Sequence, residues 1–213
     1  MYEVRFHGRG GQGAVMASAM LASALVAEGK YAVSIPAFGF ERRGAPVVSF
    51  LRCSDKIIRQ LTNIYNPDCI ICVDPTLTRS VNIFAGLKVG GTLVQATHKS
   101  LEETVVADTV GTVGLCNAVE IALEIFKRPI TNTLMLGAFA RTTGVVSLAA
   151  LKTALEESEF RDAGLAQNLL ALERGYNETV VHTITQKVAA SPKGLCISSG
   201  QISSPIPAEG VRA

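Results

Sequence analysis

The sequence predicts an α/β fold: a mostly parallel sheet with flanking helices and a Rossmann-like beginning, followed by a helical second half and an extended C-terminal tail. Strand-like and helix-like segments alternate through the first half. A glycine-rich turn, Gly8 to Gly13, joins an extended segment directly to an uninterrupted helical one. We expect the 213 residues to form one α/β domain, residues 1–184, and an irregular tail, residues 185–213, which is disordered or contacts a partner.

Composition excludes several classes of protein. A net charge of +2, from 20 basic and 18 acidic residues, is too balanced to predict binding to nucleic acid. No segment reaches the roughly 18 apolar residues of a membrane span, and the glycines of the turn interrupt what would be a secretory signal. Five cysteines at irregular spacing suit a reducing compartment. We therefore expect a cytoplasmic protein with no membrane contact.

The first strand and helix surround the glycine turn. Tyr2 to His7 alternates apolar and polar residues, so one face of this strand is expected to be partly wet or to meet a partner. His7 lies on that polar face, where it is either a simple hydrogen-bonded histidine or a catalytic one. The segment Ala14 to Glu28 has no charge before its last residue, which predicts a helix buried nearly all round.

The other elements follow from apolar runs and their periodicity. The predicted strands are Tyr31–Ala37, Val47–Leu51, Cys69–Val73, Thr92–Ala96 and a segment around Val105–Ala107, and the predicted helical segments are Lys56–Tyr65, Leu115–Phe126, Thr133–Arg141, Leu148–Glu157 and Ala163–Arg174. Asp74 and Pro75 form a helix start, with the aspartate as its cap. Cys69 and Cys72 match a CxxC pattern, but side chains three apart on a strand point to opposite faces, so we interpret both as structural.

A second unusual loop lies between two predicted strands. It reads Phe38-Gly39-Phe40-Glu41-Arg42-Arg43-Gly44-Ala45-Pro46. This loop and the glycine turn both follow the carboxyl end of a strand, so we expect them side by side, where such folds bind ligands. Arg42 and Arg43 are suited to a phosphorylated or carboxylated ligand, or alternatively to ion pairs with a neighbouring subunit.

The glycine turn itself predicts an anion site. Gly8, Gly10 and Gly13 satisfy GxGxxG between a strand and a helix, and the first N–H groups of that helix lack internal partners. However, the second strand carries no acid for a ribose before Glu41, which weakens the case for NAD. A free-standing NADP-dependent reductase, with Arg42 binding the 2′-phosphate, is one alternative, and a noncatalytic nucleotide-sensing module is another.

The sequence also lacks the common catalytic signatures. There is no GxSxG elbow, P-loop lysine, HExxH or ferredoxin-type cysteine run, and none of the three histidines has a suitably spaced carboxylate. We assign no catalytic and no metal-binding residue, and we expect this chain to need partners for a complete reaction.

Three segments in matching order resemble one protein family. They are Gly8-Arg9-Gly10-Gly11-Gln12-Gly13, the loop of residues 38–46, and Pro129-Ile130-Thr131-Asn132-Thr133-Leu134-Met135-Leu136-Gly137-Ala138. Together they resemble the gamma subunit of the 2-oxoacid:ferredoxin oxidoreductases, the pyruvate synthase group. Arylglyoxylate-type members of the family carry similar segments, so the sequence does not identify the 2-oxoacid substrate. The resemblance covers roughly residues 1–180.

The resemblance implies a subunit of an oxygen-sensitive enzyme that decarboxylates a 2-oxoacid on thiamine diphosphate, passes electrons through [4Fe-4S] clusters and releases an acyl-CoA. Thiamine diphosphate, Mg and the clusters would then belong to partners: thiamine-binding alpha and beta subunits and a ferredoxin-like cluster subunit. This chain would help to close the cleft for coenzyme A. The candidate cofactor-binding residues are Gly8, Arg9, Gly10, Gly11, Gln12, Gly13, Glu41, Arg42, Arg43 and Asn132; for Asn132, a helix cap is the alternative.

Overall fold

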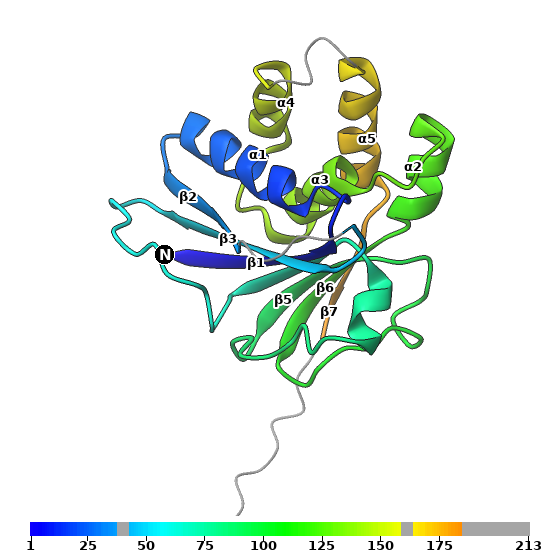
Figure 1. Ribbon diagram of the computed structural model, residues 1–213, viewed down its shortest axis with the longest axis horizontal. Helices are drawn as coiled ribbons and strands as arrows, with labels where there is room; N and C mark the ends of the chain where they lie inside the picture. Colours follow the sequence, from blue (N-terminus) through cyan, green and yellow to red (C-terminus); the bar gives the residue numbers. More distant parts are fainter. Residues whose placement is uncertain (38–42, 159–163, 185–213) are drawn as a thin grey trace, which may run out of the picture.

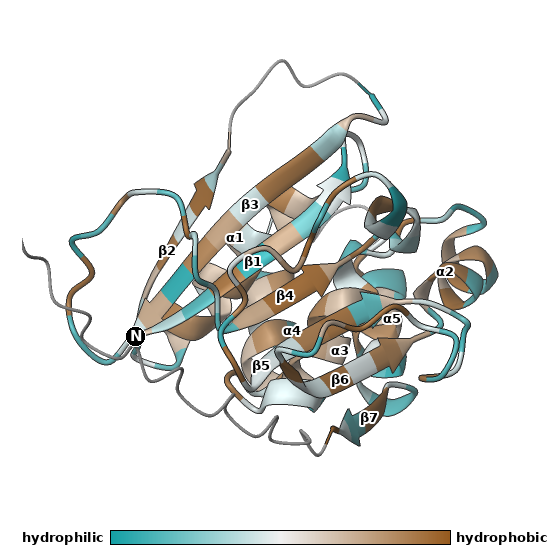
Figure 2. Ribbon diagram, turned by 90° about the horizontal axis from the view of Figure 1, so that it is seen from below, coloured by the Kyte–Doolittle hydropathy of each residue, from teal (hydrophilic) through white to brown (hydrophobic). Residues whose placement is uncertain are grey.

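The structure, a computed structural model, describes residues 1–37, 43–158 and 164–184. In these residues a seven-stranded sheet carries its helices on one face, whereas loops and one short 3-10 helix cover the other (Figure 1). Figure 2 looks onto the loop-covered face, with the helices behind the sheet. The predicted tail, residues 185–213, lies outside the described residues.

The sheet is parallel at its centre and antiparallel at both edges. Its strands are β1 (Tyr2–Arg9), β2 (Tyr31–Pro36), β3 (Pro46–Ser54), β4 (Cys69–Cys72), β5 (Gly91–Ala96), β6 (Val110–Cys116) and β7 (Val180–Thr183), in the order β2-β3-β1-β4-β5-β6-β7. Strands β1, β4, β5 and β6 are parallel, while β3 runs antiparallel to β1 and β2, and β7 to β6. The predicted α/β class is confirmed, and the antiparallel edges are an addition to it.

The helices form one layer above the sheet. They are α1 (Ala14–Ala27), α2 (Ala118–Phe126), α3 (Asn132–Thr143), α4 (Leu148–Glu156) and α5 (Leu165–Asn177); the 3-10 helix η1 (Pro75–Arg79) lies apart from them. Asp74 caps η1 as predicted, accepting a hydrogen bond from the N–H of Thr76. No helix in the described part of the chain has the length and apolar character needed to cross a membrane.

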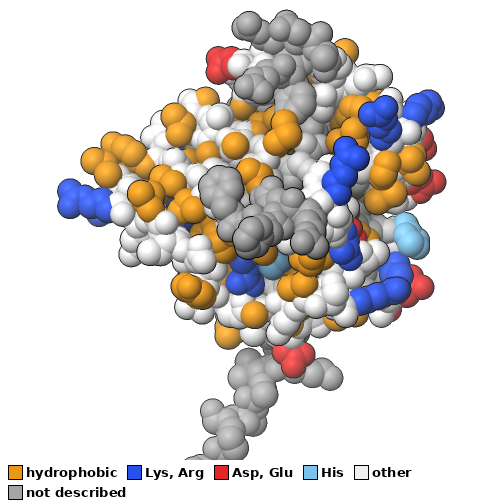
Figure 3. Space-filling model, viewed as in Figure 1, with side chains coloured by type: hydrophobic (Ala, Val, Ile, Leu, Met, Phe, Trp, Pro, Cys, Tyr) orange, Lys and Arg blue, Asp and Glu red, His pale blue; other side chains and the backbone are white. Residues whose placement is uncertain are grey.

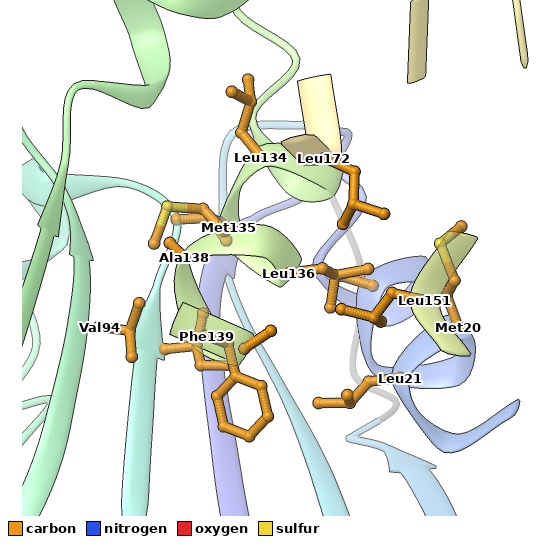
Figure 4. Packing of buried hydrophobic residues seen from close by; sticks show 14 of the residues in the cluster. Met20, Leu21, Val94, Leu134, Met135, Leu136, Ala138, Phe139, Leu151 and Leu172 are labelled. Atoms are coloured by element: carbon orange, nitrogen blue, oxygen red, sulfur yellow. The ribbon is translucent and has the colours of Figure 1, made fainter. Parts of the chain in front are cut away.

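Helix α3 lies at the centre of the core. Figure 4 shows Phe139, Met135 and Ala138 of this helix packing toward the sheet and Leu136 toward α1. On its other side α3 approaches α5 so closely that each helix needs a glycine. A Cβ on Gly137 would collide with the carbonyl oxygen of Leu172, and one on Gly175 with that of Leu134. The glycine in the third recognised segment therefore permits direct packing of two helix backbones.

The polar face of β1 is buried, which corrects the expectation that this face is partly wet or meets a partner. Arg5 lies under the loop that follows η1, and its guanidinium donates to the carbonyl oxygens of Ile83 (2.8 Å) and Ala85 (2.7 Å). Its Nε donates to Nε2 of His7 at 3.0 Å. Loops cover the polar groups here by hydrogen-bonding them, and His7 is a structural acceptor rather than an exposed catalytic group.

The prediction of a helical segment at Lys56–Tyr65 is wrong. This segment is irregular because its carbonyl groups are used by a buried arginine. Arg52 donates to the carbonyl oxygens of Thr62 (2.6 Å), Gln60 (3.3 Å) and Asn63 (3.3 Å), while its Nε pairs with Glu3 at 2.9 Å. A helix would direct these carbonyls along its own axis and leave the guanidinium unsatisfied.

Several boundaries also differ from the predictions. Val105–Ala107 is not a strand: the strand of this region is β6, which extends through Leu115 and Cys116, and α2 begins only at Ala118. Strand β7 was not predicted, because its four residues are mostly exposed and carry little apolar pattern. The opposite orientation of Cys69 and Cys72 is confirmed, since they belong to the cores on the two different faces of the sheet.

Helix α1 is less buried than its uncharged sequence predicts. Ala17, Leu21 and Leu25 are buried against the sheet and neighbouring helices, but Met16 and Val26 are exposed on its outer side. The absence of charge therefore does not mark a helix that is enclosed all round. It leaves an outer side without charged groups next to the glycine turn.

Candidate functional site

The glycine turn between β1 and α1 forms a compact loop that is closed by the side chain of Gln12. The N–H of Arg9 donates to Oε1 of Gln12 at 2.7 Å, and the N–H of Gln12 donates back to the carbonyl oxygen of Arg9 at 3.0 Å. Gly11 (φ 92°) and Gly13 (φ 75°) take left-handed conformations that favour glycine. Gly8 is required for a different reason: a Cβ there would lie 2.7 Å from Val73.

A single carboxylate holds this turn in place. Oδ2 of Asp74 accepts from Nε of Arg9 at 3.0 Å and from Nε2 of Gln12 at 2.9 Å, while its Oδ1 accepts from Thr76. The Arg9 guanidinium also donates to the hydroxyl of Thr76 and to the carbonyl oxygen of Gly44, each at 3.0 Å. Arg9 and Gln12 therefore brace the turn, and the N–H groups of Arg9, Gly10 and Gln12 are themselves used within the protein. The Asp74-Pro75 pattern predicts only the cap of η1 and not these contacts with the turn.

The hydrogen bonds to Asp74 also determine its ionisation. Burial would raise the pKa of this carboxyl, but hydrogen bonds from Thr76 and Gln12 and the charge of Arg9 outweigh it and hold the pKa below its usual range. The folded chain therefore favours the ionised form of this carboxyl more strongly than the unfolded chain does. Its contribution to stability is present above the unfolded pKa of about 4 and is lost as the pH falls through the lower folded value.

We expect Asp74→Ala to lower the free energy of unfolding by about 2 kcal/mol at neutral pH, because it removes the cap of η1 and leaves Arg9 and Gln12 without their acceptor. Urea denaturation of the purified chain measures this loss. Asp55→Ala, at an exposed carboxylate, is the control. Equal small losses in the two variants would show that the turn does not depend on Asp74.

The two unusual loops lie together, as predicted, in the part that the structure describes. The N–H of Gly10 donates to the carbonyl oxygen of Ala45 at 2.9 Å, and the N–H of Gly44 donates to the carbonyl oxygen of Gly10 at 3.1 Å. Arg43 is exposed beside these contacts. Glu41 and Arg42 lie outside the described residues. The end of the second loop is thus joined to the glycine turn by backbone hydrogen bonds.

Asn132 is a wall of the pocket at the turn and does not cap its helix, which corrects one of the two predicted roles. It is the first residue of α3, Thr131 occupies the cap position, and no side chain caps this helix. The Asn132 side chain is only 5% exposed, and its Oδ1 has no hydrogen-bond partner among the described residues. Its Nδ2 lies 2.6 Å from the position that a Cβ on Gly13 would occupy.

These groups surround a pocket of about 400 Å³ at the start of α1. It is lined by Arg9, Gly10, Gly11, Gln12, Gly13, Ala14, Val15, Met16, Val47, Ile130 and Asn132. No side chain caps α1 and its first turn holds no carboxylate, so the N–H groups there remain available and carry the positive end of the helix dipole. The pocket therefore offers the backbone N–H groups at the start of α1 to an anionic ligand, whereas the unpartnered Oδ1 of Asn132 can only accept a hydrogen bond.

The charged side chains on this side of the molecule are of both signs. Figure 3 shows lysine and arginine side chains along the right-hand side, with acidic side chains among them, where Figure 1 places α2 and η1. Within residues 1–37, 43–158 and 164–184, no group of three or more His, Cys, Asp or Glu side chains is placed to hold a metal ion. The arrangement favours recognition of an anion by fixed dipoles.

A family model and individual relatives both match this chain along most of its length. Residues 3–178 match the family described as pyruvate ferredoxin/flavodoxin oxidoreductase. The chain is 78% identical over 190 residues to the NADH-dependent phenylglyoxylate dehydrogenase subunit gamma of Aromatoleum evansii, covering 89% of this chain and 100% of the relative. It is 48% identical to the pyruvate/ketoisovalerate oxidoreductases common subunit gamma of Thermococcus kodakarensis, covering 86% and 100% respectively.

A solved structure agrees with the fold. The crystal structure of the pyruvate oxidoreductase subunit PORC from Thermotoga maritima superposes with a TM-score of 0.74 at 39% sequence identity, covering 84% of this chain and 97% of that one. The likeness extends along nearly the whole of that chain.

Proposed function

Because this chain belongs to the pyruvate ferredoxin/flavodoxin oxidoreductase family and resembles its gamma subunits, we propose that it helps to close the coenzyme A and cofactor cleft of a CoA-acylating 2-oxoacid oxidoreductase. The observation that carries this proposal is the pocket at the start of α1, where no side chain caps the helix and its first N–H groups are available as donors. Coenzyme A supplies phosphates, which such donors bind.

The division of labour proposed for the complex rests on the resemblance to the family's gamma subunits. The described pocket residues provide backbone donors and one amide, but no nucleophile aligned with a base. As the resemblance implies, we place thiamine diphosphate, Mg and the [4Fe-4S] clusters in thiamine-binding alpha and beta subunits and a ferredoxin-like subunit. The part played by this chain is to bind and orient the anionic end of the coenzyme and to exclude water from the cleft.

We further propose an arylglyoxylate as the 2-oxoacid. Support comes from the relative in Aromatoleum evansii, a phenylglyoxylate dehydrogenase subunit with 78% identity, compared with 48% for the pyruvate/ketoisovalerate subunit. The complex purified from the native source should oxidise phenylglyoxylate faster than pyruvate at equal concentration. Faster turnover of pyruvate would refute this assignment without affecting the role proposed for the chain.

The role of the pocket is tested with Asn132→Ala in the assembled complex. We expect the apparent KM for coenzyme A to rise about tenfold while the subunit composition stays unchanged, because one buried hydrogen-bonding group is removed from the site. The exposed Arg59, on the loop after β3, provides the control variant Arg59→Ala.

Arg43→Ala separates the two roles left open for the arginine loop. A higher KM for coenzyme A in an intact complex assigns Arg43 to the ligand, whereas loss of partner subunits on gel filtration assigns it to assembly. If Asn132→Ala and Arg43→Ala both leave the KM and the composition unchanged, the proposed cleft is not at this turn.

A further inference from the structure

A second pocket, of about 250 Å³, lies on the loop-covered side of the sheet beyond the carboxyl ends of β4 and β5. Its polar lining includes Thr76, Arg79, Gln95, Thr97, His98 and Lys99. This is the edge at which parallel α/β sheets bind ligands. None of these residues belongs to the pocket at the glycine turn.

The floor of this pocket contains a polar group that needs a partner. Gln95 on β5 is 4% exposed, and its Oε1 has no hydrogen-bond partner among the described residues. In the strand register it is paired with Cys72 on β4 and Leu115 on β6, two members of the apolar core on this face. Buried acceptors are rarely left unpaired, and the described residues supply no donor to this amide oxygen.

The rim of the pocket carries charges that are not neutralised within the described chain. Arg79 and Lys99 are exposed, and neither forms an ion pair with any residue that the structure describes. Glu103 also lines the pocket and accepts a hydrogen bond from the N–H of Ser100. The cations favour an anionic group, whereas Glu103 and the Gln95 oxygen favour a part of the ligand that donates hydrogen bonds.

We propose that this pocket binds a phosphate monoester that carries free hydroxyl groups, such as a sugar phosphate. The phosphate lies between Arg79 and Lys99, and a hydroxyl donates to Oε1 of Gln95. A volume of about 250 Å³ suits one sugar ring with its phosphate and is small for a dinucleotide. The monoester is either a free metabolite or the phosphorylated ribose of a larger molecule such as coenzyme A.

The test is a titration of the isotopically labelled full-length chain, followed by the NMR signals of side-chain amides. The probes are ribose 5-phosphate, ribose and inorganic phosphate. We expect saturable shifts of the Gln95 amide with ribose 5-phosphate and at least tenfold weaker binding of the other two. Shifts confined to the glycine turn, or equal affinities for ribose 5-phosphate and inorganic phosphate, would overturn the proposal.

Variants locate the two halves of the ligand. Gln95→Met, which keeps the volume of the buried side chain, should weaken ribose 5-phosphate about tenfold and leave inorganic phosphate unchanged. Arg79→Ala should weaken both, and Arg59→Ala neither. If Gln95→Met fails to fold, Gln95→Glu places a negative charge on the floor and should weaken ribose 5-phosphate more than ribose. Unchanged affinity in every folded variant refutes the site.

Two further experiments distinguish this pocket from the pocket at the glycine turn and identify the molecule that supplies the phosphate. Asn132→Ala should leave ribose 5-phosphate binding unchanged, so failure of the proposed function does not imply failure here. Competition with coenzyme A and with its 3′-dephospho form then distinguishes the sources. Displacement by coenzyme A alone supports the site with the coenzyme as its ligand, and displacement by neither supports a free sugar phosphate.

Discussion

Gly137→Ala is expected to lower the free energy of unfolding by about 3 kcal/mol, because the new methyl group has no room between α3 and α5. It would collide with the carbonyl oxygen of Leu172 and lie 2.7 Å from the backbone nitrogen of Tyr176. Both neighbours are helix backbone, so relief requires the two helices to move apart across the centre of the core. Urea denaturation followed by circular dichroism measures the loss.

Gly144→Ala is the matched control for this prediction. Gly144 has φ 63° but no atom within 4 Å of an added Cβ, so its substitution tests backbone conformation without crowding. We expect it to cost about 1 kcal/mol. A loss for Gly137→Ala no larger than that for Gly144→Ala would mean that α3 and α5 tolerate separation, and that this glycine is not required for packing.

Acidification from pH 7 to pH 5 is expected to lower the free energy of unfolding by about 2 kcal/mol through His7 alone. Burial, together with the charge of Arg5, lowers the pKa of His7 to about 3 from an ordinary value of 6.5. Between these two values the unfolded chain takes up a proton that the folded chain excludes. The contribution of His7 to the free energy of unfolding is therefore fully present above pH 6.5 and decreases steadily as the pH falls toward 3.

His7→Gln should remove this pH dependence while retaining an oxygen that accepts from Nε of Arg5. Denaturant titrations at several values between pH 7 and pH 5 provide the measurement. Carboxyls with lowered pKa, such as those of Asp74 and Glu28, lose their contribution only at more acidic pH. The same slope in His7→Gln as in the original chain would show that another group titrates.

Local chemistry explains how far the sequence could predict the fold. The order of strand, glycine turn and uncharged helix fixed the first unit, and the apolar runs located β4 and β5 within a residue of their observed ends. The family read from the three motifs is confirmed by the match over residues 3–178. Lys56–Tyr65 failed because Arg52, from a neighbouring strand, takes its carbonyl groups. A contact of that kind leaves no periodic pattern within the segment.

The candidate site was predictable in its location and less so in its parts. The placement of two loops at the carboxyl ends of strands brought Gly10 and Gly44 together as expected. Spacing along the chain could not show that Asp74 accepts hydrogen bonds from the Arg9 and Gln12 side chains, because their separation in sequence is long. Nor could it distinguish Asn132 as a cap from Asn132 as a pocket wall, since an asparagine at the beginning of a helix is typical of both.

One feature of the Asp74 cluster concerns both pockets at once. Arg9 lines the pocket at the glycine turn, Thr76 lines the pocket over Gln95, and the Arg9 guanidinium is hydrogen-bonded to the Thr76 hydroxyl at 3.0 Å. A molecule that displaced Thr76 would remove one of the three acceptors that hold the Arg9 guanidinium, the others being Asp74 and Gly44. If a ligand in one pocket changes the affinity of the other pocket by some factor, then a ligand in the second pocket changes the affinity of the first by the same factor.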